Sequence, residues 1–560
     1  MSDDVTTYFG IDLGTTYSAI SYLDDTGRPS VIRNTVTNDE TMPSVVYFEN
    51  ATNVVVGSTA KEVARLYPNR VVALVKRAMG QEREWIFDNT TYTPESISAL
   101  ILKQLAQDAE QATGERVEKV VITVPAYFGM LERDATRNAG RIAGLDVVGI
   151  VPEPVAAALQ YDVVSDAVGK TILVYDLGGG TFDTTVIQIK ADSIEVVCTD
   201  GDQELGGTDW DDRLMEYLLD EFRSQANPAE DPADDEQFMQ DLALVAEQTK
   251  RRLSQVTSSK VPLRFAGASA MVEVTRAAFE EQTRDQLERT IEYTKRTLQT
   301  FAKKQALTGP PEDSIDEVLL VGGSTKMPAV AGRLSSEFGW SPRLADPDLA
   351  VAKGAARYAL ARAVWRDSTD ENESAASPAE QEQRIREVSQ QTSIPAAAIR
   401  QMAEKRVVTV LPKAFGVKLL KEDASDVFNP DPVTDYRIAH MVHANDPLPV
   451  EKVELEAATS ADNQTMVRLQ IYEQAGSVET SDVTGNKPVD QGAGEITFPP
   501  VRANSPIDIM MKVDVEGLLT VHAVERTSQH DCMVTVRVSV LSEEAVQQAA
   551  QMVSALTVKS

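Results

Sequence analysis

The feature that most constrains this chain is a tripeptide, Asp-Leu-Gly, that occurs twice at the end of an apolar run. The first copy lies in Tyr8–Thr16 and the second in Leu173–Asp183. We interpret each as a β-hairpin whose tight turn offers backbone amides to phosphate oxygens, with the aspartate at the strand end near a metal ion. One copy alone would be weak evidence, because Asp-Gly sequences end many hairpins for steric reasons. Two copies separated by the length of one α/β lobe predict two similar lobes that grip one polyphosphate between them.

Residues 5 to about 365 alternate short apolar runs with amphipathic helical patterns, which is typical of an α/β domain. Val120–Val124 is strand-like, for example, and Leu131–Ala143 is helical. One helix can be delimited in detail, since Thr93 can cap it, Pro94 suits its first turn and Gly114 can end it. Its apolar face serves packing.

A third glycine turn occurs in Val318–Pro328, where a buried strand pattern is followed by Gly322 and Gly323 and then by a helical pattern. Such a turn can pass beneath a nucleobase or a sugar. The sequence contains neither a lysine-bearing P-loop nor a dinucleotide fingerprint, so the two commonest ways of binding a nucleotide are excluded.

The composition and the hydrophobic pattern of the chain change after the α/β pattern ends. Residues 366–406 are rich in Asp, Glu, Ser, Gln and Ala and carry no aromatic residue, which predicts an acidic, solvated linker with two weak helices. Residues 407–540 contain short alternating runs such as Met466–Ile471 and Met533–Val538, and these predict a β-sandwich. Residues 541–560 are expected to form one short helix at most.

The composition says more about the possible partners of this chain than about its fold. The 560 residues include 54 basic and 86 acidic side chains, and the resulting net charge of −32 repels nucleic-acid backbones and anionic membranes. Cys198 and Cys532 lie far apart in apolar stretches, so neither a disulfide framework nor a zinc cluster is expected. The acidic N-terminus does not resemble a signal peptide, and no apolar run reaches about 20 residues. We therefore expect a cytoplasmic protein without nucleic-acid or membrane partners.

Together these motifs resemble the seventy-kilodalton heat-shock chaperone family, which has an actin-like (ribonuclease H-like) ATPase fold. The resemblance rests on segments that occur in family order: Gly10–Ser18, Val121–Phe128, Glu153–Ala158, Asp176–Asp183, Leu205–Gly207 and Val321–Pro328. Weaker matches cover most of residues 5–365, and residues 461–464 continue the resemblance in the β region. The implied architecture is a two-lobed, actin-like α/β nucleotide-binding domain over residues 5–365 and a β-sandwich substrate-binding domain over residues 407–540.

The resemblance implies that the chain binds ATP or ADP with Mg²⁺ and hydrolyses ATP. The residues implied at the phosphates are Gly14, Thr15, Thr16, Tyr17, Gly178, Gly179 and Gly180. Asp12 and Asp176 would approach the magnesium ion through its waters. The implied catalytic residues are Lys76, Glu153, Thr181 and Asp183, of which Lys76 would position the attacking water and stabilise charge on the γ-phosphate.

The resemblance also implies an adenosine pocket. Its residues would be Glu247, Lys250, Arg251 and Ser254, together with Gly322, Gly323, Ser324, Lys326 and Asp348. Without the resemblance, residues 247–254 would be interpreted as the solvated charged face of a helix. Lys326 stands where the family more often has arginine, which would weaken planar stacking on adenine.

Pro125 and Arg133 resemble a pair that relays the nucleotide state to the other domain, although Pro125 can equally be a strand terminator. Gly129, Met130 and Gly149 replace residues associated with J-domain co-chaperones, which leaves the use of such a partner open.

Three further departures from the family pattern bear on partners and coupling. The segment Gly80–Thr93 is shorter than usual, which affects the docking of a nucleotide-exchange factor. The apolar run Val407–Pro412 lacks the family's acidic residue, so coupling between the domains is expected to differ. The usual long helical lid is not expected, and bound peptides should therefore leave quickly.

The main hypothesis is thus an ATP-dependent molecular chaperone, active in protein folding and the stress response, that binds unfolded or extended polypeptide. A second hypothesis is a nucleotide-dependent scaffold that recruits one dedicated partner and has no general refolding activity. A third is a small-molecule kinase of the same superfamily, which the β region and Glu153-Pro154 disfavour.

Overall fold

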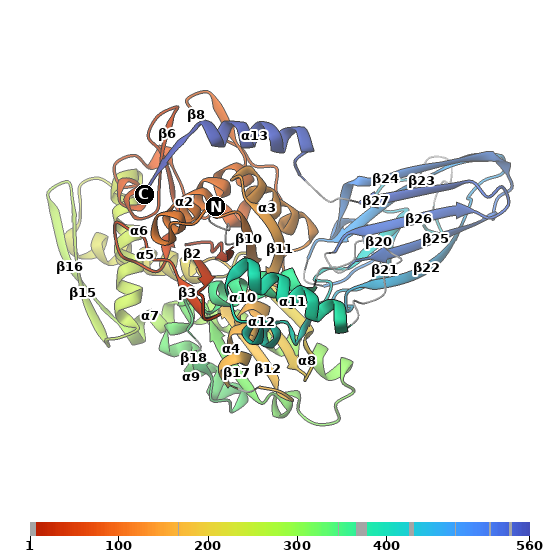
Figure 1. Cartoon of the computed structure of the whole chain (residues 1–560). Helices are drawn as coiled ribbons and strands as arrows, with labels where there is room; N and C mark the ends of the chain where they lie inside the picture. Colours follow the sequence, from red (N-terminus) through yellow and green to blue (C-terminus); the bar gives the residue numbers. More distant parts are fainter. Residues whose placement is uncertain are drawn as a thin grey trace.

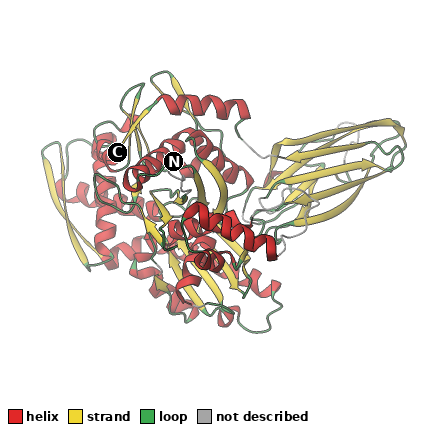
Figure 2. Ribbon diagram, viewed as in Figure 1, coloured by secondary structure: helices red, strands yellow, loops and turns green. Residues whose placement is uncertain are grey.

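The computed structural model describes residues 7–165, 167–344, 346–365, 378–424, 430–476, 478–514, 517–536 and 540–560. Its largest part is an α/β body, from which a second domain projects to one side (Figure 1). Figure 2 shows the helices gathered in this body and the second domain built of long strands.

The first lobe is built on a sheet with strand order β11-β10-β1-β2-β3. Strands β1, β10 and β11 are parallel, and β2 and β3 continue the sheet antiparallel. The first Asp-Leu-Gly turn joins β1 to β2, as the hairpin interpretation predicted. The strands are β1 (Tyr8–Asp12), β2 (Tyr17–Leu23), β3 (Pro29–Val31), β10 (Lys119–Val124) and β11 (Asp146–Pro152), and β4 (Met42–Pro43) also pairs with β2.

The second lobe repeats this plan in a sheet with strand order β18-β17-β12-β13-β14-β19. The second Asp-Leu-Gly turn joins the antiparallel pair β12 and β13, and β17 runs parallel to β12, as β10 runs parallel to β1. The strands are β12 (Thr171–Leu177), β13 (Phe182–Ile189), β14 (Ser193–Asp202), β17 (Glu317–Val321), β18 (Arg343–Leu344) and β19 (Arg406–Val408). The duplicated motif therefore marks a duplicated lobe.

Two helices lie between the sheets. Helix α10 (Ala350–Trp365) packs on the first sheet and α4 (Glu153–Ser165) on the second, and the two helices pack on each other. A Cβ added to Gly354 of α10 would lie 2.9 Å from the Cα of Ala156 in α4, so glycine is needed where the helices cross.

The remaining helices cover the outer faces of the lobes and build their outer parts. Helix α2 has the limits that the sequence predicted. Thr93 and Ser96 form a capping box at its start, and Gly114, with φ 76°, ends it. The helices are α1 (Ser58–Val63), α2 (Pro94–Thr113), α3 (Met130–Ile142), α5 (Gly207–Ala226), α6 (Glu236–Leu253), α7 (Arg276–Gln282), α8 (Arg284–Lys304) and α9 (Pro328–Phe338). None of the helices in the described residues has the length and apolar character to cross a bilayer.

Three small sheets complete the outer parts of the lobes. The first lobe carries a sheet of order β28-β6-β5-β7 and the hairpin β8-β9, and the second carries the hairpin β15-β16. Their strands are β5 (Val46–Phe48), β6 (Asn53–Val56), β7 (Val71–Val72), β8 (Trp85–Phe87), β9 (Thr90–Tyr92), β15 (Ser258–Phe265), β16 (Ala268–Thr275) and β28 (Thr557–Lys559).

The acidic segment after α10 differs from the solvated linker expected of it. Residues 366–377 lie outside the described residues, but α11 (Pro378–Thr392) and α12 (Ala396–Ala403) pack onto the α/β body. Ile385 and Ile399 are buried in the same core cluster as residues of α4 and α10. Each helix has an apolar stripe that the acidic composition conceals.

The second domain is the predicted β-sandwich. Its two antiparallel sheets have the orders β21-β20-β23-β24 and β22-β25-β26-β27, and Phe415, Leu469, Ile509 and Val521 contribute to the core between them. The strands are β20 (Phe415–Leu420), β21 (Tyr436–Val442), β22 (Val450–Ala458), β23 (Gln464–Gln474), β24 (Asn486–Val501), β25 (Pro506–Val513), β26 (Leu519–Glu525) and β27 (Asp531–Val536). Residues 537 and 538 of the last expected run lie outside the described residues.

The C-terminal segment contains more than the single short helix expected. Helix α13 (Glu543–Ala555) is followed by strand β28 (Thr557–Lys559), which pairs in parallel with β6 of the first lobe. A three-residue strand with one apolar residue is too short to be recognised from its sequence pattern.

The β-sandwich contacts both lobes. Asn445 in the loop after β21 accepts a hydrogen bond from the backbone N of Thr199 in the second lobe (2.8 Å). On the first lobe, Met130 is buried in the core cluster of the sandwich, and its backbone N donates to Oε1 of Glu473 (3.4 Å). Gly129 lies at the same contact. Two of the departures from the family pattern therefore belong to the domain interface.

A buried ion pair lies in this interface. Lys413 of the sandwich lies 3.5 Å from Glu132 of α3, and Glu473 lies beside it. Burial alone would lower the pKa of Lys413, but Glu132 and Glu473 outweigh it and raise that pKa. Burial raises the pKa of Glu473 to about 7. The interface therefore places Glu132 of the first lobe against the buried Lys413 and Glu473 of the sandwich.

Candidate functional site

The two Asp-Leu-Gly turns, one from each lobe, meet in the structure. A Cβ added to Gly179 would lie 2.7 Å from the Cβ of Thr16, and one added to Gly180 would lie 2.8 Å from the Cβ of Thr15. The backbone of the second turn thus lies directly against the threonines that follow Gly14 in the first. Only glycine leaves room for this approach, because any Cβ on the second turn would overlap these threonines.

Two further glycine turns support the Gly178–Thr181 turn. The backbone N of Gly207 donates to the carbonyl of Gly178 (2.9 Å), and that of Thr208 donates to the carbonyl of Gly179 (2.8 Å). Ser324, from the turn after β17, donates through its hydroxyl to the carbonyl of Gly178 (2.8 Å). The three glycine turns identified in the sequence, at Gly14, Gly178–Gly180 and Gly322–Gly323, therefore lie together between the lobes.

A lysine and four carboxyl groups gather where the sheets of the two lobes approach. Lys76, on the 3₁₀ helix Val75–Ala78, is only 3% exposed and donates to Oε1 of Glu153 at the start of α4 (2.6 Å). Asp12, at the end of β1, accepts a hydrogen bond from Oγ1 of Thr123 (3.1 Å). The sequence assigned no part to Thr123, whose signal was only its place in a buried strand.

The other two carboxyl groups come from the second hairpin. Asp176 lies on β12 opposite Asp183 on β13. Asp183 accepts a hydrogen bond from the backbone N of Tyr127 in the first lobe (3.0 Å). The predicted catalytic and metal-binding residues are thus brought together from both lobes, with Thr181 buried at the end of the same turn.

Burial and mutual repulsion shift the protonation of these carboxyl groups. Desolvation, and then the charge of Glu153, raises the pKa of Asp12 to about 7 and that of Asp183 to about 8. The same causes raise the pKa of Asp176 well above its ordinary value. A divalent cation at the cluster would reverse these shifts.

The donor set fits a magnesium ion, since hard carboxylate oxygens are ligands that Mg²⁺ prefers. Among the described residues, no group of three or more His, Cys, Asp or Glu side chains could hold a metal ion by itself. A magnesium ion near Asp12 and Asp176 would therefore take most of its ligands from phosphate oxygens and water, as this ion commonly does.

We expect the stability of the nucleotide-free protein to fall as pH rises from 5 to 8. Asp12 and Asp183 have higher pKa values in the folded chain than their ordinary 3.8, so their contribution is complete below about pH 4 and is lost as pH rises through their folded values. The expected loss of unfolding free energy is about 2 to 5 kcal/mol. Denaturant unfolding of the α/β domain in a chelator at several pH values measures it.

The variant Asp183→Asn isolates this effect from the other carboxylates of the chain. Between pH 5 and 8 the unfolding free energy of this variant should fall by less than that of the parent protein, because the asparagine amide does not ionise. Equal pH dependence of the two proteins would show that Asp183 is not buried as an unfavourable charge.

Of the predicted adenosine residues on α6, Glu247 and Arg251 face the first lobe, and the Glu247 side chain is largely buried there. The hydroxyl of Tyr17 donates to Oε1 of Glu247 (2.9 Å), and Arg251 pairs with the same carboxylate (2.8 Å). The guanidinium of Arg251 lies 4.7 Å from the centre of the Tyr17 ring. Lys61 of α1 donates to the Tyr17 hydroxyl (2.8 Å) and pairs with Glu247. Lys61 was missed, because nothing near it in the sequence indicates that it reaches the other lobe.

The remaining predicted adenosine residues surround the third turn. Lys250 donates to the carbonyl of Gly207 (2.6 Å) and to Oδ2 of Asp211 (2.8 Å). Lys326 pairs with Asp348, which lies beside Gly323. Gly322, with φ 83°, has the left-handed conformation that favours glycine and lets the chain turn after β17.

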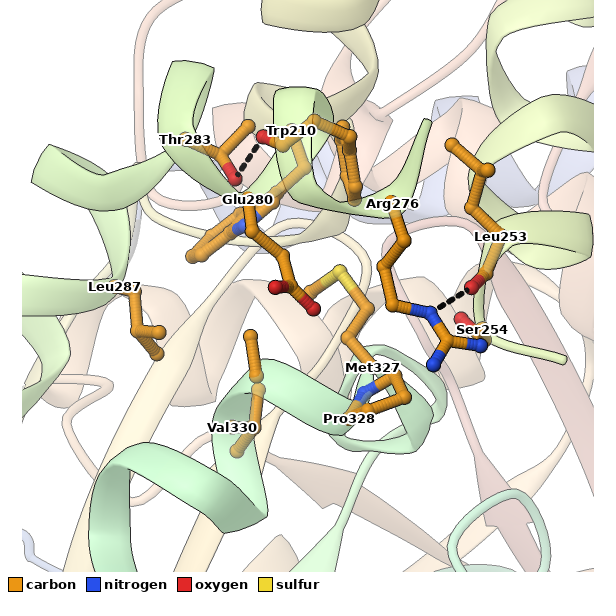
Figure 3. Close-up of a pocket in the computed structure, with 12 residues that line it drawn as sticks. Trp210, Leu253, Ser254, Arg276, Glu280, Thr283, Leu287, Met327, Pro328 and Val330 are labelled. Atoms are coloured by element: carbon orange, nitrogen blue, oxygen red, sulfur yellow. Dashed lines mark hydrogen bonds between the residues drawn. The ribbon is translucent and has the colours of Figure 1, made fainter. Parts of the chain in front are cut away.

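A small pocket lies beside Ser254, the remaining predicted adenosine residue of the 247–254 segment (Figure 3). Its interior is about 20 Å³, room for one water molecule. Arg276 closes one side and donates from Nε to the carbonyl of Leu253 (2.7 Å). The lining residues are Trp210, Leu253, Ser254, Arg276, Phe279, Glu280, Thr283, Leu287, Met327, Pro328, Ala329 and Val330. This pocket is too small for a nucleoside and includes none of the phosphate-turn residues, so it is a packing gap beside the site.

Arg77 is a third residue that sequence reasoning missed, after Thr123 and Lys61. From the first lobe, its Nε donates to the carbonyl of Gly180 (3.0 Å) and its Nη2 to Oδ2 of Asp209 (2.6 Å). Asp209 in turn accepts from the backbone N of Gly206 (2.7 Å). Arg77 thus fixes two of the glycine turns; its position next to Lys76 was the only signal.

Arg133 of the expected relay pair contacts the loop that follows Pro125. Arg133 donates from Nε to the carbonyl of Phe128 (2.9 Å) and from Nη2 to that of Ala126 (3.4 Å). Burial lowers its pKa to about 10, which leaves it charged at neutral pH. Arg133 therefore holds the turn that carries Tyr127.

A family model described as Hsp70 protein matches residues 8–89 and 83–363. The match begins in β1 and ends in α10, so it includes both lobes, the three glycine turns and the acidic cluster around Lys76, and it covers more than half of the chain.

Proposed function

The chain belongs to the Hsp70 family, and on that premise we propose that it binds and hydrolyses Mg-ATP to control the binding of unfolded or extended polypeptide by its β-sandwich. Its first part is the actin-like ATPase domain of the family, and a β-rich domain follows. The observation that carries the proposal is the meeting of Thr15 and Thr16 of one lobe with Gly179 and Gly180 of the other.

The phosphates of the nucleotide would lie between the two hairpin turns. The amides of Gly178–Gly180 and the hydroxyls of Thr15 and Thr16 would donate to phosphate oxygens. A magnesium ion, approached by Asp12 and Asp176 through water, would neutralise charge on the phosphates when bound. The tight packing of the turns means that the lobes would open slightly to admit the nucleotide.

The lysine and carboxyl groups would then promote hydrolysis by position and charge. Lys76 is held by Glu153, so its ammonium would orient the attacking water and stabilise charge at the γ-phosphate. Asp183 and Thr181 would complete the polar surroundings of that water.

On the adenosine side, Lys250, Arg251, Ser254 and Ser324 would hold the ribose and base. The Glu247 carboxylate, with partners in both lobes, would close the cleft over the nucleotide. The ion pair of Lys326 with Asp348 would position the Lys326 chain beside the base.

Communication with the β-sandwich would pass through Tyr127. Its backbone N donates to Asp183, while its hydroxyl donates to the carbonyl of Gly476 in the sandwich (3.1 Å). One residue thus touches both a catalytic carboxylate and the other domain. ATP and ADP would favour different domain arrangements and thereby different peptide affinities, and the sandwich would hold peptide by strand addition and side-chain pockets.

The proposal is tested by measuring ATP turnover of the pure protein with and without a permanently unfolded polypeptide. We expect saturable stimulation by the polypeptide. The scaffold hypothesis predicts turnover that is indifferent to peptide, and it gains support from Gly129 and Met130, because the sandwich itself covers positions associated with a J-domain co-chaperone. Phosphate transfer to a small acceptor would instead favour the kinase hypothesis.

A further inference from the structure

The C-terminal segment of the chain returns to the first lobe after the sandwich ends. We call residues 543–559, which comprise α13 and β28, the C-terminal clasp. In Figure 1 the blue helix α13 lies over the first lobe, apart from the sandwich strands of similar colour. Strand β28 pairs with β6 in the register Thr557 to Asn53, Val558 to Val54 and Lys559 to Val55.

The clasp is built into the core of the first lobe. Val546 and Val553 of α13, together with Leu556 and Val558, are buried in the same core cluster as residues of α2, α3 and β6. Each of these four side chains is at most 8% exposed. Their burial, rather than the short strand pairing alone, holds the clasp in place.

Polar contacts fix both ends of the helix. Lys103 of α2 donates from Nζ to the carbonyls of Val553 (2.9 Å) and Leu556 (3.1 Å), which caps the C-terminal end of α13. At the other end, Arg141 of α3 pairs with Glu543. The first lobe therefore presents side chains placed for this segment.

A strand also attaches the other end of the sandwich, but to the second lobe. Before the first sandwich strand, β19 pairs with β14, with Arg406 opposite Ser193 and Val408 opposite Glu195. The β-sandwich is thus joined to one lobe at each of its ends. Any change in the angle between the lobes moves these two attachments relative to each other.

Chain length limits how far the sandwich can move while the clasp is seated. Only six residues, 537–542, join β27 to α13, and seven steps of extended chain reach about 25 Å. Separation of the sandwich beyond that distance requires α13 to leave its place on the first lobe.

We propose that the C-terminal clasp holds the β-sandwich in its docked arrangement and couples this arrangement to the angle between the lobes. Its response to nucleotide rests on the proposed function, whereas the holding of the sandwich does not. Release of the clasp frees the edge of β6 and lets the sandwich separate from the first lobe.

The test places charges on the buried side of the clasp. In the full chain, the double variant Val553→Asp with Val558→Asp should speed hydrogen exchange of residues 543–559 by about 100-fold or more and increase the radius of gyration in solution scattering. The matched control, Ser554→Asp with Thr557→Asp, adds the same charges at neighbouring exposed positions and should change neither quantity. Fast exchange with an unchanged radius would overturn the proposal, as would full protection of the clasp in the double variant.

A locked variant keeps the test decisive if the charged variant does not fold. Cysteines at the paired positions, Asn53→Cys with Thr557→Cys, would join β6 to β28 when oxidised. The oxidised protein should lose any nucleotide-dependent change in radius and regain it on reduction. An unlocked protein that binds no Mg-ATP would contradict the proposed function, while an oxidised protein that still expands with nucleotide would contradict the clasp alone.

Discussion

Replacing Lys76 with methionine is expected to lower ATP turnover by about 10² to 10³-fold, while Mg-ATP still binds. Methionine keeps the length and the apolar contacts of the lysine chain but removes the ammonium that lies 2.6 Å from Glu153. The phosphate turns and the adenosine residues do not depend on this ammonium. Single-turnover hydrolysis and calorimetric titration with Mg-ATP measure the two quantities separately.

Two further variants show whether the loss is catalytic. Lys76→Met leaves Glu153 without its buried partner, which is costly in itself, so Lys76→Met with Glu153→Gln should recover stability without recovering turnover. Lys260→Met, at an exposed position on β15, should match the parent protein. Undiminished hydrolysis in the Lys76 variant would rule out its part in positioning the water.

Replacing Gly179 with valine is expected to weaken Mg-ATP binding by at least about 100-fold, or roughly 2.7 kcal/mol. A Cβ at this position would lie 2.7 Å from the Cβ of Thr16, so the two hairpin turns could not approach each other, and the added side chain would cover the amides. Because the loss is one of binding, it should lower affinity in a titration rather than turnover at saturation.

A second glycine provides the control. Gly332→Ala in α9 meets no atom within 4 Å and should leave nucleotide affinity unchanged. Both proteins should unfold at similar denaturant concentrations if the effect is local to the site. Tight Mg-ATP binding by the Gly179 variant would mean that the phosphates are held elsewhere.

Most of the architecture follows from local sequence signals. The duplicated Asp-Leu-Gly turn predicted two hairpins and, through them, two similar lobes, because turn chemistry acts over only a few residues. The limits of α2 followed from Thr93 and Gly114 for the same reason. Alternating runs after residue 407 predicted the sandwich, since a two-residue period is intrinsic to a strand with one buried face.

The residues of the site divide along a similar line. Asp12 and Asp176 were predicted because each ends a strand before a recognisable turn, and Asp183 was implied by the resemblance to the chaperone family. Lys61 and Arg77 were not, since their partners lie 186 and 132 positions away in the sequence. From the sequence alone, a charged side chain on a short helix is expected to be solvated. Only the folded structure shows that its partner comes from the other lobe.

The sequence by itself determined the hairpins, the two lobes and the β-sandwich. Only the tertiary structure decided that residues 378–403 pack on the α/β body, that Met130 enters the sandwich core and that the C-terminus adds a strand to β6. The physical reason is that periodicity and turn chemistry are properties of neighbouring residues. An apolar stripe or an open strand edge indicates only that some partner must cover it. The folded structure shows which segment does so.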